Sequence, residues 1–523
     1  MSRLALAASF LLALTVLPGR AAMAEPPGCE QALAQVKHAR RTGGSTLPAA
    51  MTALEAAAEA GAAPCQGALG RSYYLADGVP KDSAAAVRWL MLAAGQGHGP
   101  SQSLLGLLYL RGHGIDRDPA QASSWFRKAA EQGDADGQAW LGVMLRDGTG
   151  GTQNLTEAAR WLREAAEQDH AAAQVSLGVM YRDGTGVARD PALAARWFRK
   201  AAQHGDARGQ LWLAVMLRDG SGVARDDKEA AKWLRKAVAT GLAPAQYQLG
   251  QMYRQGRGVP RDETQAVFLF RKAAAQGDRD ARMALALMAR DGIAMARDYD
   301  AAVRQLRALA DEGYTPAQTN LGLMYKDGLG VARDREQAEQ WFRKAADHND
   351  ASGQVWLGSS LRDRGQYDEA RQWLLKAAEG GNAPAQRLLG AMYRQGQGAA
   401  KDPEQALAWY RRAAEGGDAN AQTWLGAMLR DGDGCARNDA EAVAWFQKAA
   451  DQGAFPAMHN LAYMYRYGRG VPRDPVQAYV YLHLAADHGV QAATTALGEV
   501  AAELNPVQLA AAQMMLRMRK GGD

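Results

Sequence analysis

A repeat of 36 residues constrains the fold of this 523-residue chain more than any other feature of its sequence. A leucine followed by a small residue marks the repeat, and the spacing holds except between Gly358 and Gly390, which are 32 residues apart. The small residues are Gly106, Gly142, Gly178, Ala214, Gly250, Ala286, Gly322, Gly358, Gly390, Gly426 and Ala462. A repeat of this length indicates an array of small units, each of which buries its apolar face only against its neighbours.

Each unit contains two helical patterns separated by a glycine-containing turn. In the first pattern, as in Ala317–Tyr325, apolar residues recur three or four positions apart, as on one face of a helix. The second pattern, as in Asp334–Asp350, begins with an aspartate suited to cap a helix, and in several copies a proline follows it. These prolines are Pro119, Pro191, Pro403 and Pro475. Stacking such pairs predicts an all-α solenoid of antiparallel helix pairs, with twelve units over residues 61–488.

One unit, residues 349–380, is four residues shorter than the others. Gly322 and Ala338, which mark the two helices of an ordinary unit, are 16 positions apart, whereas Gly358 and Ala370 are 12 apart. Loops tolerate changes of length better than packed helical faces do. We therefore expect a shortened loop with both helical faces unchanged. The functional alternative is an altered loop surface or a local change of curvature.

The units resemble a known family. Segments such as LGVMYRDGTGVARDPALAARWFRKAA (Leu177–Ala202) are similar to Sel1-like repeats, relatives of the tetratricopeptide repeat with a longer loop between the helices. The resemblance covers about residues 61–488 and implies a right-handed α-solenoid that binds proteins or peptides without catalysing a reaction. By analogy with tetratricopeptide repeats, it also implies that part of each first helix faces a concave side.

The two ends of the chain differ from the repeats. Residues 1–24 have a charged start, an apolar run from Leu4 to Leu17 and the sequence Ala22-Met23-Ala24, which is the pattern of a secretory signal cut before Glu25. The run is too short for a transmembrane helix, and no later apolar run reaches its length. We expect a periplasmic or secreted protein without a transmembrane segment. A degenerate helix pair in 25–60 and helices in 489–523 are expected to cap the array.

The chain has three cysteines, and an exported protein enters an oxidising compartment. Cys29 lies in the predicted cap and Cys65 in the first helix of the first unit, so adjacent helices can bring them together. Cys435 lies ten units away in a loop. The sequence therefore predicts a Cys29–Cys65 disulfide and a free Cys435.

Composition and motifs argue against several classes of function. Lys and Arg number 61 and Asp and Glu 56, with no long basic run, so a nucleic-acid partner is not expected. No nucleophile, metal-ligand or phosphate-binding motif is found, so we expect no enzyme activity, cofactor or metal. Some secreted relatives of the family have been linked to β-lactam binding or hydrolysis. Those relatives are rich in paired cysteines, a pattern that this chain lacks.

Two rows of side chains on the first helical pattern are candidates for binding a partner. A cation lies four residues after the small residue in ten consecutive units, and an aspartate follows it in seven of them. The cations are Arg146, Arg182, Arg218, Arg254, Arg290, Lys326, Arg362, Arg394, Arg430 and Arg466. A tryptophan precedes the marker leucine in alternate units, at Trp140, Trp212, Trp356 and Trp424.

Each row has a binding and a structural interpretation. The cations either grip a partner on the concave side, or stabilise helix ends and form Arg–Asp ladders between stacked units. The tryptophans are either anchors in a groove or part of the core. The expected function is an exported, non-enzymatic scaffold that binds a protein or peptide partner. A structural role in a cell-envelope or exopolysaccharide-export assembly is the alternative, and β-lactam binding or hydrolysis is a remote one.

Overall fold

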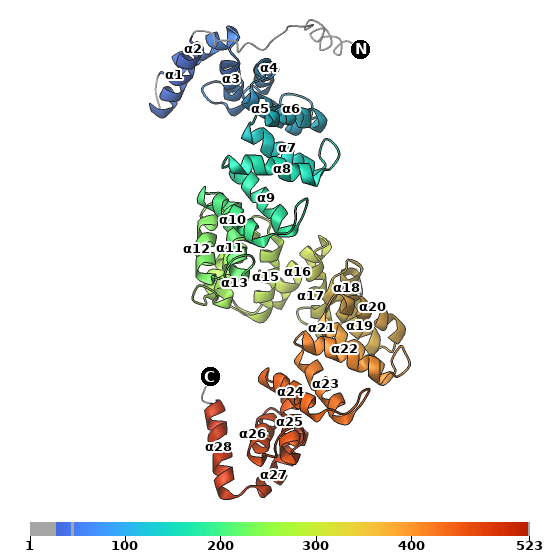
Figure 1. Cartoon of the computed structure of the whole chain (residues 1–523). Helices are drawn as coiled ribbons and strands as arrows, with labels where there is room; N and C mark the ends of the chain where they lie inside the picture. The colour runs from blue at the N-terminus through green and yellow to red at the C-terminus, as the bar shows by residue number, and fades with distance from the viewer. Residues whose placement is uncertain (1–27, 43–45, 521–523) are drawn as a thin grey trace. The chain divides into compact units, whose positions relative to one another are not determined.

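The computed structural model describes residues 28–42 and 46–520 of the chain, and these residues form 28 α-helices and no strand. The predicted leader, residues 1–24, lies outside the described residues. The helices alternate between a first and a second member of a pair (Figure 1). The first helices are α1 (Cys29–Thr42), α3 (Ala63–Leu75), α5 (Gly99–Arg111), α7 (Ala135–Asp147), α9 (Ala171–Asp183), α11 (Ala207–Asp219), α13 (Ala243–Gln255), α15 (Arg279–Asp291), α17 (Thr315–Asp327), α19 (Ala351–Asp363), α21 (Ala383–Gln395), α23 (Ala419–Asp431), α25 (Phe455–Tyr467) and α27 (Gln491–Glu503). The second helices are α2 (Leu47–Glu59), α4 (Ser83–Gly95), α6 (Pro119–Glu131), α8 (Leu155–Glu167), α10 (Pro191–Gln203), α12 (Asp227–Ala239), α14 (Glu263–Ala274), α16 (Tyr299–Asp311), α18 (Arg335–Asp347), α20 (Tyr367–Glu379), α22 (Pro403–Glu415), α24 (Asp439–Asp451), α26 (Pro475–Asp487) and α28 (Pro506–Lys520).

The chain divides into two compact units, residues 1–276 and 277–523, and each is described by itself. Within each, a helix packs against the helix before it and the helix after it, which is the solenoid that the repeat predicts. The fold is therefore all-α, as expected from the sequence.

The helix ends follow the predicted capping chemistry. Before α18, the carboxylate of Asp334 accepts hydrogen bonds from the backbone N–H groups of Glu336 and Gln337, both at 2.9 Å. At the other end, α17 stops at Gly328, whose φ of 73° lies in the left-handed region that glycine adopts without strain. The same two devices recur through the array, which explains why nearly every helix has 13 residues.

The core of each pair depends on the size of the marker residue. A Cβ built on Gly322 would lie 2.5 Å from the ring of Phe342 on the second helix, so only glycine leaves room for that ring. Where the marker is alanine, as at Ala214, the facing residue on the second helix is the smaller Leu234, which is 2% exposed. Each aromatic residue at this position of a second helix thus faces a glycine, whereas a leucine there faces either an alanine or a glycine, as at Gly142 and Leu162.

The loop that joins the two helices of a pair packs closely against the preceding pair. Gly330, at a φ of 67°, lies so close to α16 that a Cβ there would be 2.6 Å from the carbonyl oxygen of Tyr299. Tyr299 is the first residue of α16, and the equivalent loop glycine of other units meets the equivalent residue. The second loop glycine therefore has a packing role in addition to its role in the turn.

The shortened unit keeps its helical packing and loses this loop contact. In α19 and α20, Gly358 faces Leu374 as Gly142 faces Leu162 in a full-length unit. The connection is only residues 364–366, and a Cβ added to Gly365 would meet no atom within 4 Å. Arg364 instead donates to Glu339 of α18 at 3.0 Å. The four missing residues are loop residues.

A disulfide holds the first helix of the array to its neighbour, and apolar contacts hold the last helix. A disulfide joins Cys29 of α1 to Cys65 of α3, with Cα atoms 5.9 Å apart, while Cys435 is a free thiol. At the other end α28 packs on α26 through Val480, Ala512 and Leu516. These contacts hold the terminal helices, which have a neighbour on one side only, to the rest of the array.

Candidate functional site

The first helices form the inner side of each compact unit. Successive first helices contact one another directly, as in α5 with α7 and α17 with α19. Among the successive second helices of the described residues, a comparable contact is found between α26 and α28. A solenoid curves toward the side on which its helices lie closest together. The predicted cation row and tryptophan row both lie on these first helices.

The cations of the row are mostly paired within their own units. Arg182 donates from Nε and Nη2 to the two carboxylate oxygens of Asp183, at 2.6 and 2.8 Å. These hydrogen bonds lower the pKa of the Asp183 carboxyl. All seven cations that precede an aspartate pair with it: Arg146, Arg182, Arg218, Arg290, Lys326, Arg362 and Arg430.

The expected Arg–Asp ladder between stacked units is therefore wrong for these seven cations. Adjacent residues at a helix end satisfy each other first, because no change of loop or helix position is needed to bring them together. Among the described residues of the row, the contact between units that the ladder requires is found at Arg394, which reaches Asp433 at 3.5 Å.

The same cations also reach forward to the next unit. Arg182 lies over the indole of Trp212, 4.1 Å from the ring centroid, and Arg394 lies over Trp424 at 4.5 Å. Where the next unit has an amide instead of a tryptophan, the contact is a hydrogen bond, as from Arg430 to Asn460 at 2.7 Å. The last cation, Arg466, reaches Glu499 and Glu503 of α27. Most of the row is thus a set of contacts that lock neighbouring units together.

The tryptophans of the first helices are partly core and partly surface. Trp212 stacks on Phe198 of the preceding second helix with ring centroids 6.1 Å apart, and Trp140, Trp356 and Trp424 stack in the same way on Phe126, Phe342 and Tyr410. Burial raises the pKa of Tyr410 to about 12. Trp424 is nevertheless 42% exposed. A flat indole edge on the inner side is a surface that a partner can contact.

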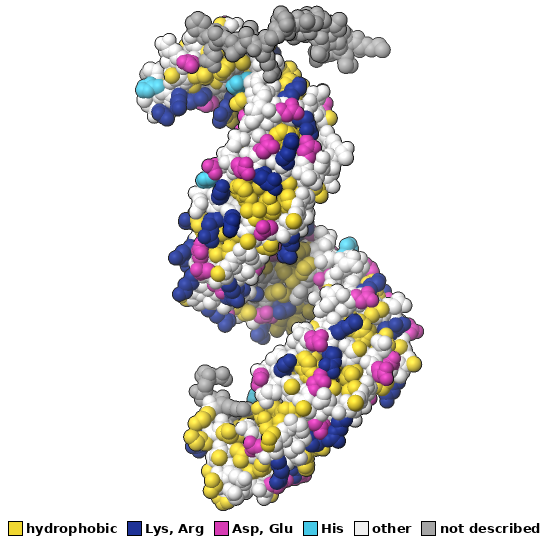
Figure 2. All heavy atoms as spheres, viewed as in Figure 1, with side chains coloured by type: hydrophobic (Ala, Val, Ile, Leu, Met, Phe, Trp, Pro, Cys, Tyr) yellow, Lys and Arg dark blue, Asp and Glu magenta, His cyan; other side chains and the backbone are white. Residues whose placement is uncertain are grey.

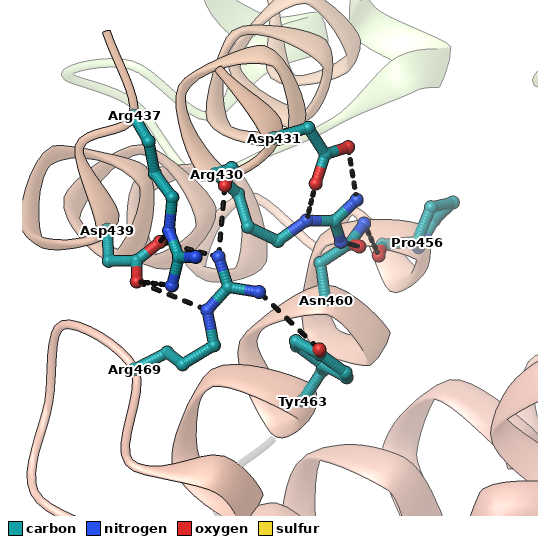
Figure 3. A network of polar contacts seen from close by, with 8 residues as sticks. All are labelled: Arg430, Asp431, Arg437, Asp439, Pro456, Asn460, Tyr463 and Arg469. Atoms are coloured by element: carbon teal, nitrogen blue, oxygen red, sulfur yellow. Dashed lines mark hydrogen bonds and ion pairs between the residues drawn. The ribbon is translucent and has the colours of Figure 1, made fainter. Parts of the chain in front are cut away.

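A network of charged side chains ties two units together at α23–α26 (Figure 3). Arg469, in the loop after α25, donates to the Asp439 carboxylate at 2.8 Å and to the backbone carbonyl of Arg430 at 3.0 Å. Arg437 donates to the same carboxylate at 2.5 Å. The two guanidinium groups, that of Arg437 first, hold the pKa of the Asp439 carboxyl far below its ordinary value. We call these four residues the clasp.

The clasp occurs a second time, 212 residues earlier in the chain. Arg257 donates to Asp227 at 2.9 Å and to the carbonyl of Arg218 at 2.9 Å, and Arg225 donates to Asp227 at 2.8 Å. Both copies need an arginine in the loop of one unit and an aspartate at the start of the preceding second helix. These two positions meet only through the fold, since they are 30 residues apart in sequence.

In the described part of the chain, hollows lie between first helices. One, of about 570 Å³, is bordered by α3, α5 and α7 and includes Arg71, Leu104 and Trp140. Another, of about 390 Å³, lies between α19 and α21 beside Trp356. The third, of about 410 Å³, lies between α11 and α13 and includes Arg218, Arg254 and Arg257. Arg254 differs from the rest of the row, because it has no hydrogen bond, ion pair or ring contact with any described residue.

A row of buried glutamines crosses the array and was not singled out by the sequence analysis. Gln102 donates to the carbonyl of Ala94 at 3.0 Å and accepts a hydrogen bond from Gln132 at 2.7 Å. The signal in the sequence is a glutamine four residues before the marker residue in most units. The other buried members are Gln66, Gln138, Gln174, Gln210, Gln246, Gln318, Gln354, Gln386 and Gln422. Their partners are backbone carbonyls, other glutamines and the carboxylates of Glu164 and Asp169, all within the chain, so this row is structural.

The second helices carry their own contacts between units. Arg127 donates to Glu157 at 2.7 Å, and Glu157 also accepts from the indole nitrogen of Trp161 at 3.2 Å. The Arg127 hydrogen bond lowers the pKa of Glu157. The same trio recurs as Arg343, Glu369 and Trp373, and as Arg411, Glu441 and Trp445. These charged side chains therefore pair with one another and hold neighbouring units together.

The surface carries both signs of charge. Figure 2 shows Lys and Arg interspersed with Asp and Glu on the visible face, with hydrophobic side chains between them. In the described residues, no His, Cys, Asp and Glu side chains gather in a group that could hold a metal ion. Of the described helices, none combines the length and the apolar character that crossing a membrane requires.

Comparisons with known proteins agree with this architecture. No curated protein matches the chain. A crystal structure of a protective antigen of uropathogenic Escherichia coli strains, described as having an SLR fold, is 33% identical over 90% of this chain and 94% of that one, with a TM-score of 0.55. A Sel1 repeat protein from Oxalobacter formigenes is 28% identical over 54% of this chain and 96% of its own, with a TM-score of 0.39. The Sel1 repeat family matches eleven segments: 63–98, 99–134, 135–170, 171–206, 207–241, 243–278, 315–350, 353–382, 383–418, 419–453 and 456–490.

Proposed function

Because the chain belongs to the Sel1 repeat family, we propose that it is an exported scaffold that binds a protein or peptide partner along its first helices. Repeat solenoids of this type are generally used for protein–protein interaction, and Sel1 repeat proteins are generally non-catalytic. The inner side of such arrays offers a long surface of repeated side chains to an extended partner.

One observation carries the proposal, namely that the exposed aromatic surface of the first helices lies beside hollows. Trp140 and Trp356 each border a hollow, and Trp424 is 42% exposed. Large aromatic side chains at a concave surface are favoured anchors in interfaces because they contribute much apolar area at little cost in side-chain entropy. On the second helices, by contrast, the indoles of Trp161, Trp373 and Trp445 donate to glutamates that pair with an arginine of the preceding unit.

Export supports the same proposal from the sequence. The pattern of residues 1–24 is that of a cleaved leader, and a Cys29–Cys65 disulfide suits an oxidising compartment. The partner would accordingly be another exported or envelope protein.

Site-specific photo-crosslinking in the native cell tests the proposal. A photoreactive phenylalanine analogue at Trp424, on the inner side, is compared with the same analogue at Phe268, which is 51% exposed on the second helix α14. We expect a specific crosslinked partner from position 424, none from position 268, and a recovered chain that begins at Glu25. Crosslinks from position 268 alone, or an intact Met1, would contradict the proposal.

A further inference from the structure

Among the cations of the row, Arg254 is the one that has no partner in the described part of the chain. It lies in the last turn of α13 and borders the hollow of about 410 Å³ between α11 and α13. In seven other units an aspartate follows the cation, but Gln255 follows Arg254. No hydrogen bond, ion pair or ring contact links its guanidinium to any described residue.

The other charges at this hollow are already satisfied. Arg218 pairs with Asp219 at 2.7 Å and donates to Gln248 at 2.5 Å. Arg257 is held by Asp227 and by the carbonyl of Arg218 as part of the second copy of the clasp. Because Arg225 and Arg257 share the single carboxylate of Asp227, the hollow carries a net positive charge. Arg254 is the guanidinium at the hollow that has no partner among the described residues.

The rest of the row shows which group fits this position. Five arginines at the same phase bind a carboxylate through Nε and Nη2, with distances between 2.6 and 3.1 Å. A guanidinium and a carboxylate match in this two-point geometry, and the pair is among the stronger polar contacts in proteins. At Arg254 no described residue of the chain supplies that carboxylate.

We propose that the hollow between α11 and α13 binds an acidic side chain of the partner. The two carboxylate oxygens of that side chain accept hydrogen bonds from Nε and Nη2 of Arg254. This inference rests on the proposed function, since it names the chemistry of the partner at one point along the first helices of residues 1–276. A side-chain carboxylate of an extended segment enters the hollow, and the exposed amide of Gln255 lies beside it. The neighbouring units contribute no such site, because their cations are occupied.

Two substitutions test the site in opposite ways. Arg254→Ala removes the guanidinium, whereas Gln255→Asp leaves it in place and supplies the internal carboxylate that seven other units have. Arg208→Ala is the control, because Arg208 is an exposed arginine of α11 outside the hollow, and its loss changes the net charge by the same amount. Circular dichroism establishes that each variant is folded.

The probes are N-acetylglutamate N-methylamide and N-acetylglutamine N-methylamide, followed by saturation-transfer NMR on the full-length mature protein. We expect the glutamate probe to bind about tenfold or more tightly than the glutamine probe, as a hydrogen-bonded charge pair predicts. Arg254→Ala and Gln255→Asp should each remove that preference, and Arg208→Ala should keep it. Equal binding of the two probes, or a preference that survives both substitutions, overturns the inference.

The outcome is separable from that of the proposed function. If crosslinking from position 424 captures a partner while the glutamate probe shows no preference, the scaffold function stands and the acidic acceptor site is wrong. If the probe behaves as expected and position 424 captures nothing, the acceptor site stands and the proposed partner surface is wrong.

Discussion

At the scale of single residues, arginines at the same position of the repeat make different contacts. Arg182, Arg394 and Arg254 occupy the same phase of the repeat. The first pairs with the next residue, the second reaches Asp433 of the following unit at 3.5 Å, and the third has no partner among the described residues. The row and the aspartates that follow seven of its cations are visible in the sequence. The partner of Arg394 is not, because a residue about 30 to 40 positions away depends on how two loops approach each other.

The clasp residue Asp439 allows a prediction with a defined pH dependence. Asp439→Asn leaves Arg437 and Arg469 without their shared carboxylate, and we expect the free energy of unfolding to fall by about 1–2 kcal/mol at pH 7. The folded-state pKa of Asp439 is lowered, so its contribution is complete above the ordinary aspartate pKa of about 3.9 and declines as the pH falls below that value. Thermal unfolding at pH 7 and pH 3 measures the change.

The difference between wild type and Asp439→Asn should therefore shrink from pH 7 to pH 3. Asp116→Asn is the control, because Asp116 is exposed and has no ion-pair or hydrogen-bond partner among the described residues. A difference that is the same at both pH values would show that the variant acts through packing and not through the charge.

At the scale of helices, the packing rule is that an aromatic side chain on the second helix faces a glycine marker on the first. Sequence periodicity predicts which residues face inward, and it predicted the pairing of helices correctly. It did not predict the size match, because the two members lie on different helices about 20 positions apart. In the structure, glycine faces each of Phe126, Phe198, Phe270, Phe342, Tyr410 and Phe446.

This rule predicts a non-additive pair of substitutions. Gly322→Ala gains about 1 kcal/mol of helix propensity but forces a Cβ to within 2.5 Å of the Phe342 ring, and such overpacking costs about 1–3 kcal/mol. We expect a net loss of stability for Gly322→Ala. In the double variant with Phe342→Leu, that loss should disappear, because Ala214 and Leu234 already form this combination.

Denaturant unfolding of the two single variants and the double variant measures the coupling between the sites. Contacting residues show coupling energies of about 0.5–3 kcal/mol in such cycles. Effects that simply add would mean that the glycine is required for backbone reasons and not for the ring.

At the scale of the whole molecule, each unit contacts only its neighbours, so disturbances remain local. The sequence indicated the array and its special ends. It did not reveal that the shortened unit lacks the loop contact with the preceding second helix. That contact depends on a glycine whose partner is a backbone carbonyl in another unit, as at Gly330 and Tyr299.

The disulfide tests this locality. In the chain-entropy description, a bond that closes a loop of 36 residues stabilises by about 4 kcal/mol. We expect Cys29→Ser with Cys65→Ser to increase amide hydrogen exchange strongly in α1–α3 and to leave α20–α26 unchanged. Cys435→Ser is the control and should alter exchange at neither place. Faster exchange throughout the chain would show that the array unfolds as one cooperative body.

Cations of the row contact side chains of the unit that follows, and this gives the array a direction. Arg182, Lys326 and Arg430 each need a side chain supplied by the unit that follows, and at the end Arg466 is satisfied by two glutamates of α27. Most units of the row thus supply a cation to the unit that follows, and α27 supplies the acceptors for the last cation. A unit that makes this contact can be gained or lost inside the array without leaving its cation unpaired, provided that the unit after it supplies an acceptor.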